Sequence, residues 1–153
     1  MYRSRLGKNL GKVTLDYVSS LNDDMEIVLY DIVGSQAHAI MLYENKIITK
    51  KEIKKILKGL ENLKKEKFEK KSSSEDIHEL IESLIIKRIG IDAGGKMHTA
   101  RSRNDQVALD IRMKIRDDIN IVCQCLLDTI KSLVLLAKKH QETIIPLYTH
   151  LQQ

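Results

Sequence analysis

Apolar residues recur at helical spacing along most of this chain, and residues that break helices are rare. Proline occurs once, at Pro146, and glycine is sparse. Apolar residues three or four positions apart fall on one face of a helix. This spacing predicts helices over about 23–43, from 49 through 60, over 73–90 and over about 104–140. We find no convincing strand pattern and no internal repeat, so we expect an all-α fold.

Capping signals mark the starts and one end of these predicted helices. In a capping box, a Ser or Thr and an acidic residue three positions later bond to each other's backbone N–H. Three such pairs are present: Thr49 with Glu52, Ser73 with Asp76, and Ser102 with Asp105. Gly90 is expected to end the 73–90 helix as its C-terminal cap. The segment 91–100 contains two adjacent glycines, and we expect a loop there.

The 104–140 helix is the longest predicted element, at roughly 55 Å for a rise of 1.5 Å per residue. Its apolar positions form one continuous face: Val107, Ile111, Ile115, Ile119, Val122, Leu126, Ile130, Leu133 and Ala137. No other predicted helix is long enough to cover this face. We therefore expect an oligomeric bundle, an incomplete chain, or both, and the abrupt end at 150–153 favours the second. The expected domains are a helical domain over 1–99 and the start of a bundle over 100–153.

Composition and charge place the chain among soluble globular proteins. Hydrophobic residues make up 42% and charged residues 31%, with a net charge of +5. Much of the positive excess lies in 50–71, where Lys and Glu alternate and Phe68 is the only aromatic residue. A nucleic-acid groove would more often carry Arg and interleaved aromatic residues. We interpret this run as a solvated helix face and expect no nucleic-acid partner.

The N-terminal residues and the cysteines indicate a cytoplasmic protein. Residues 1–12 lack the apolar region of a signal peptide. We expect no membrane partner, because no apolar run approaches the length of a bilayer span. Cys123 and Cys125 would point in nearly opposite directions on a helix, so they cannot pair or chelate together. We predict two reduced thiols in the protein core, as is usual in the cytoplasm.

The densest group of chemically active side chains is the 98–106 segment, His-Thr-Ala-Arg-Ser-Arg-Asn-Asp-Gln. It lies where a predicted loop enters the longest helix, so free N–H groups and the positive end of the helix dipole face it. Arginine can hold a carboxylate through two parallel hydrogen bonds. A dicarboxylate or phosphate site is therefore chemically natural. The alternative is a well-capped helix with solvated charges, and the residues alone leave both open.

The 98–106 segment resembles the HTGRSRNDQ signature of argininosuccinate lyases, with Ala100 where the family has glycine. Three further segments match in the right order. Residues 74–78 resemble the family's acidic EDIH segment, and 148–152 resemble its YTHLQ segment. Residues 31–35 resemble the segment that follows a substrate-binding serine, a role that would fall on Ser20. The resemblance covers the chain from about residue 19 onward.

The resemblance implies a carbon–nitrogen lyase of arginine biosynthesis, which eliminates fumarate from argininosuccinate and releases L-arginine. The implied catalytic residues are His150 and His78, and the implied substrate-binding residues are Ser20, Ser102, Arg103, Asn104 and Thr149. His150 would transfer a proton, because the imidazole pKa lies near neutrality. We favour it as the general acid, although the sequence leaves the role of base open. The chemistry needs no cofactor, and the dispersed histidines suggest no metal site.

The resemblance also implies an assembly. In the wider aspartase and fumarase superfamily the active site is built from several subunits of a homotetramer, and a Gly-Ser-Ser-x-Met-Pro loop supplies the catalytic serine. These 153 residues contain no such loop, so we expect this chain alone to be inactive and the full-length protein to be a homotetramer. Alternatives are a sibling such as adenylosuccinate lyase, a structural protein of the same lineage, or a basic helical module that binds nucleic acid or a partner helix. A salt-dependent gel shift would reveal nucleic-acid binding.

Overall fold

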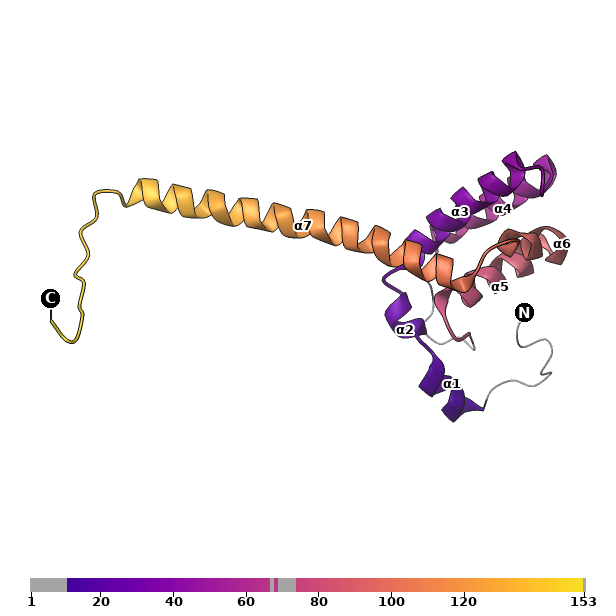
Figure 1. The fold of residues 1–153 in the computed structure, drawn as a ribbon, viewed down its shortest axis with the longest axis horizontal. Helices are drawn as coiled ribbons and strands as arrows, with labels where there is room; N and C mark the ends of the chain where they lie inside the picture. The colour runs from indigo at the N-terminus through magenta and orange to yellow at the C-terminus, as the bar shows by residue number, and fades with distance from the viewer. Residues whose placement is uncertain (1–10, 67, 69–73, 153) are drawn as a thin grey trace. The chain divides into compact units, whose positions relative to one another are not determined.

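A computed structural model describes residues 11–66, 68 and 74–152 of the chain, and its regular elements are helices (Figure 1). They are α1 Lys12–Val18, α2 Leu21–Asp24, α3 Val28–Glu44, α4 Lys50–Leu63, α5 Ile77–Ile89, α6 Ile91–Gly94, the 3-10 helix η2 Gly95–His98, and α7 Arg103–Lys139. Within these described ranges there is no strand, only an isolated bridge between Thr149 and Gln152. The predicted all-α fold is confirmed.

The chain divides into two compact units, Met1–Lys114 and Ile115–Gln153. The first holds α1 to η2 and the first turns of α7, and the second holds the rest of α7 and the C-terminal segment. The expected domain division near residue 99 stays a prediction.

The core of the first unit lies among α3, α4 and α5, which pack against one another (Figure 1). Isoleucine and leucine fill it at helical spacing. The fully buried apolar side chains include Ile32, Leu42, Ile56, Leu60, Leu63, Ile77, Ile81 and Ile85. Burying each such side chain contributes about 1.5–3 kcal/mol relative to leaving it exposed. This core holds α3 and α5 in place, and both helices supply residues of the candidate site described below.

The predicted cap of α4 is present, whereas the cap of α5 differs from the predicted one. Glu52 N donates to Thr49 Oγ1 at 3.3 Å, and Thr49 N donates to Glu52 Oε2 at 2.7 Å, so the capping box is complete. Asp76 caps α5 by accepting a 2.6 Å hydrogen bond from the backbone N of Glu79. The sequence predicted Ser73 as the capping residue with Asp76 as its partner, but Ser73 lies outside the described residues, and α5 begins at Ile77 with Asp76 itself as the cap. Gly90 ends α5 with φ of 86°, a left-handed conformation that favours glycine.

Two predicted elements were wrong in detail. The single helix expected over 23–43 is split into α2 and α3, because tight turn hydrogen bonds from Glu26 N to Asp23 O and from Ile27 N to Asp24 O interrupt it. The loop expected over 91–100 is instead mostly helical, as α6 and η2. There Gly94 serves close packing rather than a break, since a Cβ on it would lie 2.9 Å from Ile86 Cα.

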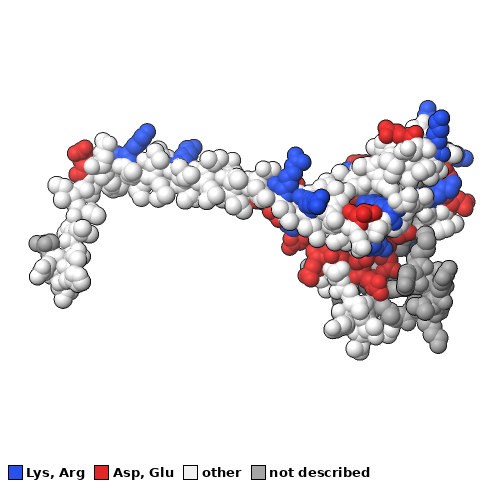
Figure 2. Space-filling model, in the orientation of Figure 1, with Lys and Arg blue, Asp and Glu red and all other residues white. Residues whose placement is uncertain are grey.

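The second unit carries apolar side chains that nothing in the unit covers. Every described residue from 115 to 152 is exposed, and charged residues are sparse on the visible face of α7 beyond its first turns (Figure 2). Cys123 and Cys125 are also exposed, so their prediction as core thiols was wrong for this chain.

One sequence expectation about membranes needs correction. Within α7 an 18-residue window has a mean hydropathy of 1.7, and none of it is buried. By length and composition alone this helix could therefore cross a membrane, whereas we expected no apolar run of that extent. The evidence for a span is weak, because a core helix of a soluble bundle passes the same test.

Candidate active site

The 98–106 segment forms the entry to α7, as predicted, and its middle residues face solvent. Asn104 N donates to Ser102 Oγ at 3.2 Å, and Ser102 N donates to Asp105 Oδ2 at 3.0 Å. These two bonds form the expected cap. Ser102 and Asn104 are exposed and Arg103 is half-buried. The first turn of α7 therefore presents a hydroxyl, a guanidinium and an amide beside the positive end of a helix dipole, where an anion can bind.

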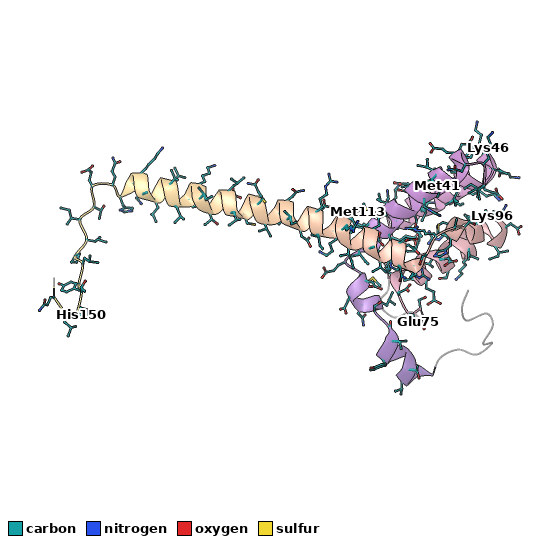
Figure 3. All side chains as sticks on the ribbon, viewed as in Figure 1. Met41, Lys46, Glu75, Lys96, Met113 and His150 are labelled. Carbon is teal, nitrogen blue, oxygen red and sulfur yellow. The ribbon has the colours of Figure 1, made fainter. Side chains whose placement is uncertain are left out.

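Arg103 and Ser20 both contact the segment that leads into α5. Arg103 Nε lies 3.4 Å from Asp76 Oδ2. Ser20 N donates to the carbonyl of Glu75 at 3.0 Å, and Ser20 Oγ donates to Asp24 Oδ2 at 2.7 Å. Figure 3 labels Glu75 at this point. Ser20 and Arg103 are 83 positions apart in the sequence. They nevertheless contact the adjacent residues Glu75 and Asp76.

A group of buried ionisable side chains lies behind this surface, and we call Asp31, His78 and Asp110 the buried cluster. Their exposed fractions are 0%, 2% and 0%. His78 Nδ1 lies 3.0 Å from Asp31 Oδ1 and 3.6 Å from Asp110 Oδ2. Both distances are those of ion pairs, but neither contact is a hydrogen bond, and both oxygens of Asp110 lack a hydrogen-bond partner. Three helices, α3, α5 and α7, each supply one member.

Two residues of the 98–106 segment connect it to the buried cluster. Gln106 Nε2 donates to Asp31 Oδ1 at 2.8 Å, and its Oε1 lies 3.0 Å from His98 Nε2. Arg101 Nη1 donates to Ser35 Oγ at 2.8 Å, while its Nη2 lies 3.9 Å from Asp31 Oδ1. Asp31 Oδ1 is therefore a shared point of attachment for α5, for α7 and for the loop before α7.

Burial and mutual charge shift the pKa values within the buried cluster in different directions. Burial raises the pKa of Asp110 to about 7, and the charge of Asp31 adds to this. Burial also raises the pKa of Asp31, but His78, Gln106 and Arg101 outweigh it, so the pKa of Asp31 is lowered. Burial lowers the pKa of His78, but the neighbouring carboxylates, above all Asp31, raise it overall. Both directions favour an ion pair of an ionised Asp31 and a protonated His78.

The buried cluster could also be considered as a metal site. Each of its three residues offers one ligand atom, and these atoms lie within 4.8 Å of one another. However, Gln106 Nε2 and the Arg101 guanidinium already approach Asp31 Oδ1. A guanidinium beside the ligands would repel a cation. This arrangement suits a proton-linked ion-pair network better than a metal centre.

Thr149 and His150 belong to the second unit, and their relation to the first unit's site residues stays a prediction. Thr149 and Gln152 exchange two backbone hydrogen bonds, at 2.8 and 3.0 Å. Between them His150 and Leu151 have φ of 53° and 63°, the signs of a type I′ turn. His150 is exposed, and Figure 3 labels it in this turn. A positive φ is uncommon for such residues, and strained backbone of this kind is frequent at functional sites.

The sequence pattern did not reveal the buried cluster or the two residues that connect it to the 98–106 segment, Arg101 and Gln106. Asp31 was noted only as part of a matching segment, and Arg101 and Gln106 only as members of the 98–106 segment. One signal was available. Asp31 interrupts an apolar run between Tyr30 and Ile32, and Asp110 follows Gln106 by four residues on one helix face. A charged residue in such a setting indicates a buried carboxylate that requires a partner.

Comparison with known proteins gives one consistent result. A family model described as "Lyase" matches residues 11–153. The chain is 71% identical over 153 residues to a protein named argininosuccinate lyase from Nitrosopumilus maritimus, covering 100% of this chain and 32% of that protein. A protein of the same name from Methanocaldococcus jannaschii is 45% identical, with 98% and 32% covered. The chain spans about a third of the length of the curated relatives it matches.

Proposed function

We propose that this chain, which belongs to the lyase family, supplies the N-terminal part of an enzyme that eliminates fumarate from argininosuccinate and releases L-arginine. The names of its relatives support the substrate. The observation that carries the proposal is the exposed first turn of α7, where Ser102, Arg103 and Asn104 stand together. This turn offers charge-assisted hydrogen bonds to a carboxylate-rich substrate.

The elimination makes specific demands on the protein. A base removes a weakly acidic proton beside a carboxylate, and the resulting aci-carboxylate carries additional negative charge. Donors already in position around that charge usually provide the largest catalytic contribution. We assign Arg103 and Asn104 to the succinyl carboxylates, with Ser102 supporting them as cap of α7. Ser20 and Thr149 add hydrogen bonds to the substrate.

His150 is assigned to proton transfer. The departing guanidinium nitrogen must be protonated as the carbon–nitrogen bond breaks, and a histidine titrates in the right range for this step. Exposure of His150 in a tight turn is consistent with contact to a substrate. We favour the role of general acid. His78, the other histidine of the predicted set, is treated separately below because it is buried.

The proposal includes the assembly. The uncovered apolar face of α7 requires a partner surface of similar length, and further bundle helices of a homotetramer would provide it. We propose that the active site is completed by other subunits, that the enzyme acts in the cytoplasm, and that these 153 residues alone release no fumarate.

The test uses the complete enzyme that contains this chain, with fumarate release measured on argininosuccinate and, separately, on adenylosuccinate. We expect turnover of the first substrate only. Asn104→Ala should lower kcat/KM by about 100-fold, as loss of one preorganised donor typically does. Asn120→Ala, an exposed amide in the second unit, is the matched control and should change little. Turnover of adenylosuccinate instead would identify a sibling lyase, and turnover of neither substrate would refute the proposal.

A further inference from the structure

We propose that His78 is a positioning residue: with Asp31 and Asp110 it holds Arg101 and Gln106, and it thereby fixes the 98–106 segment in the shape that presents the first turn of α7 to the substrate. The proposal rests on the proposed function only for the identity of the substrate. It departs from the role of catalytic residue that the family resemblance implies for this histidine. Its basis is the geometry of the buried cluster.

Burial argues first against direct contact between His78 and substrate. The His78 side chain is 1% exposed, as is that of Asp31, and the Asp110 side chain is 0% exposed. A group that transfers a proton must reach the reacting atom directly or through one water. His78 Nδ1 lies 3.0 Å from Asp31 Oδ1 and 3.6 Å from Asp110 Oδ2. Its ring therefore serves contacts inside the protein.

The 98–106 segment contains both inward-pointing and exposed side chains. Arg101 and Gln106 point inward to Ser35 and Asp31, whereas Ser102 and Asn104 are exposed. Inward anchors on both sides of the exposed residues determine where those residues lie. Additional attachments are the 2.9 Å contact of His38 Nε2 with the carbonyl of Thr99 and the contact of His98 with Gln106.

The inward anchors Arg101 and Gln106 depend on His78. Asp31 Oδ1 accepts from Gln106 and lies near Arg101, and it is fully buried. A buried carboxylate is costly unless a cation or donors compensate its charge. His78 lies 3.0 Å from Asp31 Oδ1, closer than the Arg101 guanidinium at 3.9 Å. Without His78 this carboxylate would be under-compensated and would tend to take up a proton, which weakens its hold on Gln106 and Arg101.

Gly34 shows how closely the network is packed. A Cβ on Gly34 would lie 3.4 Å from Arg101 Nη2 and 3.5 Å from Asp110 Oδ1. The α3 backbone therefore directly adjoins both an anchor of the 98–106 segment and a member of the buried cluster. Displacement of either group would therefore also shift the 98–106 segment. A shift of about 1 Å in groups that position a substrate can reduce catalysis roughly 100-fold.

The experiment compares His78→Gln, His78→Leu and Gln106→Leu in the complete enzyme. Gln keeps a hydrogen-bond donor but cannot transfer a proton, and Leu keeps neither. We expect His78→Leu and Gln106→Leu each to raise KM for argininosuccinate by at least about tenfold, and the double variant to add little further because both changes break one connection. His78→Gln should recover most of this loss, and both limbs of the kcat pH profile should remain. His140→Gln, an exposed histidine outside the network, is the control.

A role in proton transfer would give a different pattern. Both His78 variants would then lose at least about 100-fold in kcat, one limb of the pH profile would disappear, and Gln106→Leu would not reproduce the effect. That result would overturn the proposal. If His78→Leu does not fold, His78→Gln and Gln106→Leu still distinguish the two patterns.

A second measurement does not depend on the reaction. Amide hydrogen exchange over 99–104 should speed up by at least about tenfold in Gln106→Leu and in His78→Leu, but not in His140→Gln. If the parent enzyme does not turn over argininosuccinate, the proposed function fails, and hydrogen exchange still tests the positioning role. Unchanged exchange in folded variants would overturn the positioning role whatever the activity.

Discussion

The two units of this chain treat their apolar side chains in opposite ways. In the first unit, α3, α4 and α5 enclose isoleucines and leucines that are completely buried. In the second unit, every described residue is exposed, although α7 there is as rich in leucine and isoleucine as the core. The same residue types at the same helical spacing therefore give a closed core in one region and an open face in the other. The helical pattern specifies the face, but only the number and length of neighbouring helices determine whether it is covered.

The two units also differ in where they hold their ionisable side chains. The first unit uses its interior to hold charged groups at set distances, as in the buried cluster. The second unit holds His150 on a short turn of strained backbone.

The largest effect is expected when the same substitution is made at two leucines of the 153-residue chain, one in each unit. Leu60 is 0% exposed and Leu126 is 57% exposed. Leu60→Ala should lower the free energy of unfolding by about 2–5 kcal/mol through lost burial and a cavity. Leu126→Ala should stay within about 0.5 kcal/mol. Urea unfolding, with hydrogen exchange to assign the affected region, measures both.

An equal loss for Leu126→Ala would break the contrast. It would mean that the apolar face of α7 is buried in solution, and sedimentation at several concentrations would then show whether copies of the chain cover it.

A smaller effect is expected from pH, and it arises in the first unit. The pKa values of Asp110 and His78 are raised, so folding binds protons at both groups. The stability from these protons is present below the ordinary pKa values and is lost as pH rises through the folded ones, about 7 for Asp110. Asp31 has the opposite effect. Because its pKa is lowered, its contribution to stability is present near neutral pH and is lost only in acid. Unfolding free energy should therefore fall by on the order of 1 kcal/mol from about pH 6 to about pH 8.

The matched variant for this pH effect is Asp110→Asn, which removes one titrating group at nearly constant volume. Its unfolding free energy should depend less on pH over that interval, as followed by urea midpoints at each pH. An unchanged slope would show that Asp110 titrates at its ordinary pKa and that the buried cluster is not coupled as described.

Which features the sequence could predict follows from the range of the interactions. The capping box at Thr49 and the Gly90 end depend on residues within a few positions, and both are found. The break between α2 and α3 lies in short turn hydrogen bonds that apolar spacing does not reveal, and the helical 91–98 segment packs closely on α5 through Gly94; the sequence predicted neither. The buried cluster joins residues 31, 78 and 110, so no local pattern reveals it. The site residues from the resemblance remain proposals.

The smallest expected effect comes from Ala100, which occupies the position where argininosuccinate lyases carry glycine. Its φ is 56°, a left-handed conformation that costs an L-residue roughly 1–2 kcal/mol, whereas glycine adopts it freely. Since glycine also loses more entropy on folding, Ala100→Gly should stabilise the first unit by about 0.5–1 kcal/mol in urea unfolding. Ala108→Gly, in the regular part of α7, should instead destabilise by about as much. Equal losses in both variants would mean that residue 100 does not hold this conformation in solution. The expected gain would show that the first unit fixes its loop against a local backbone cost.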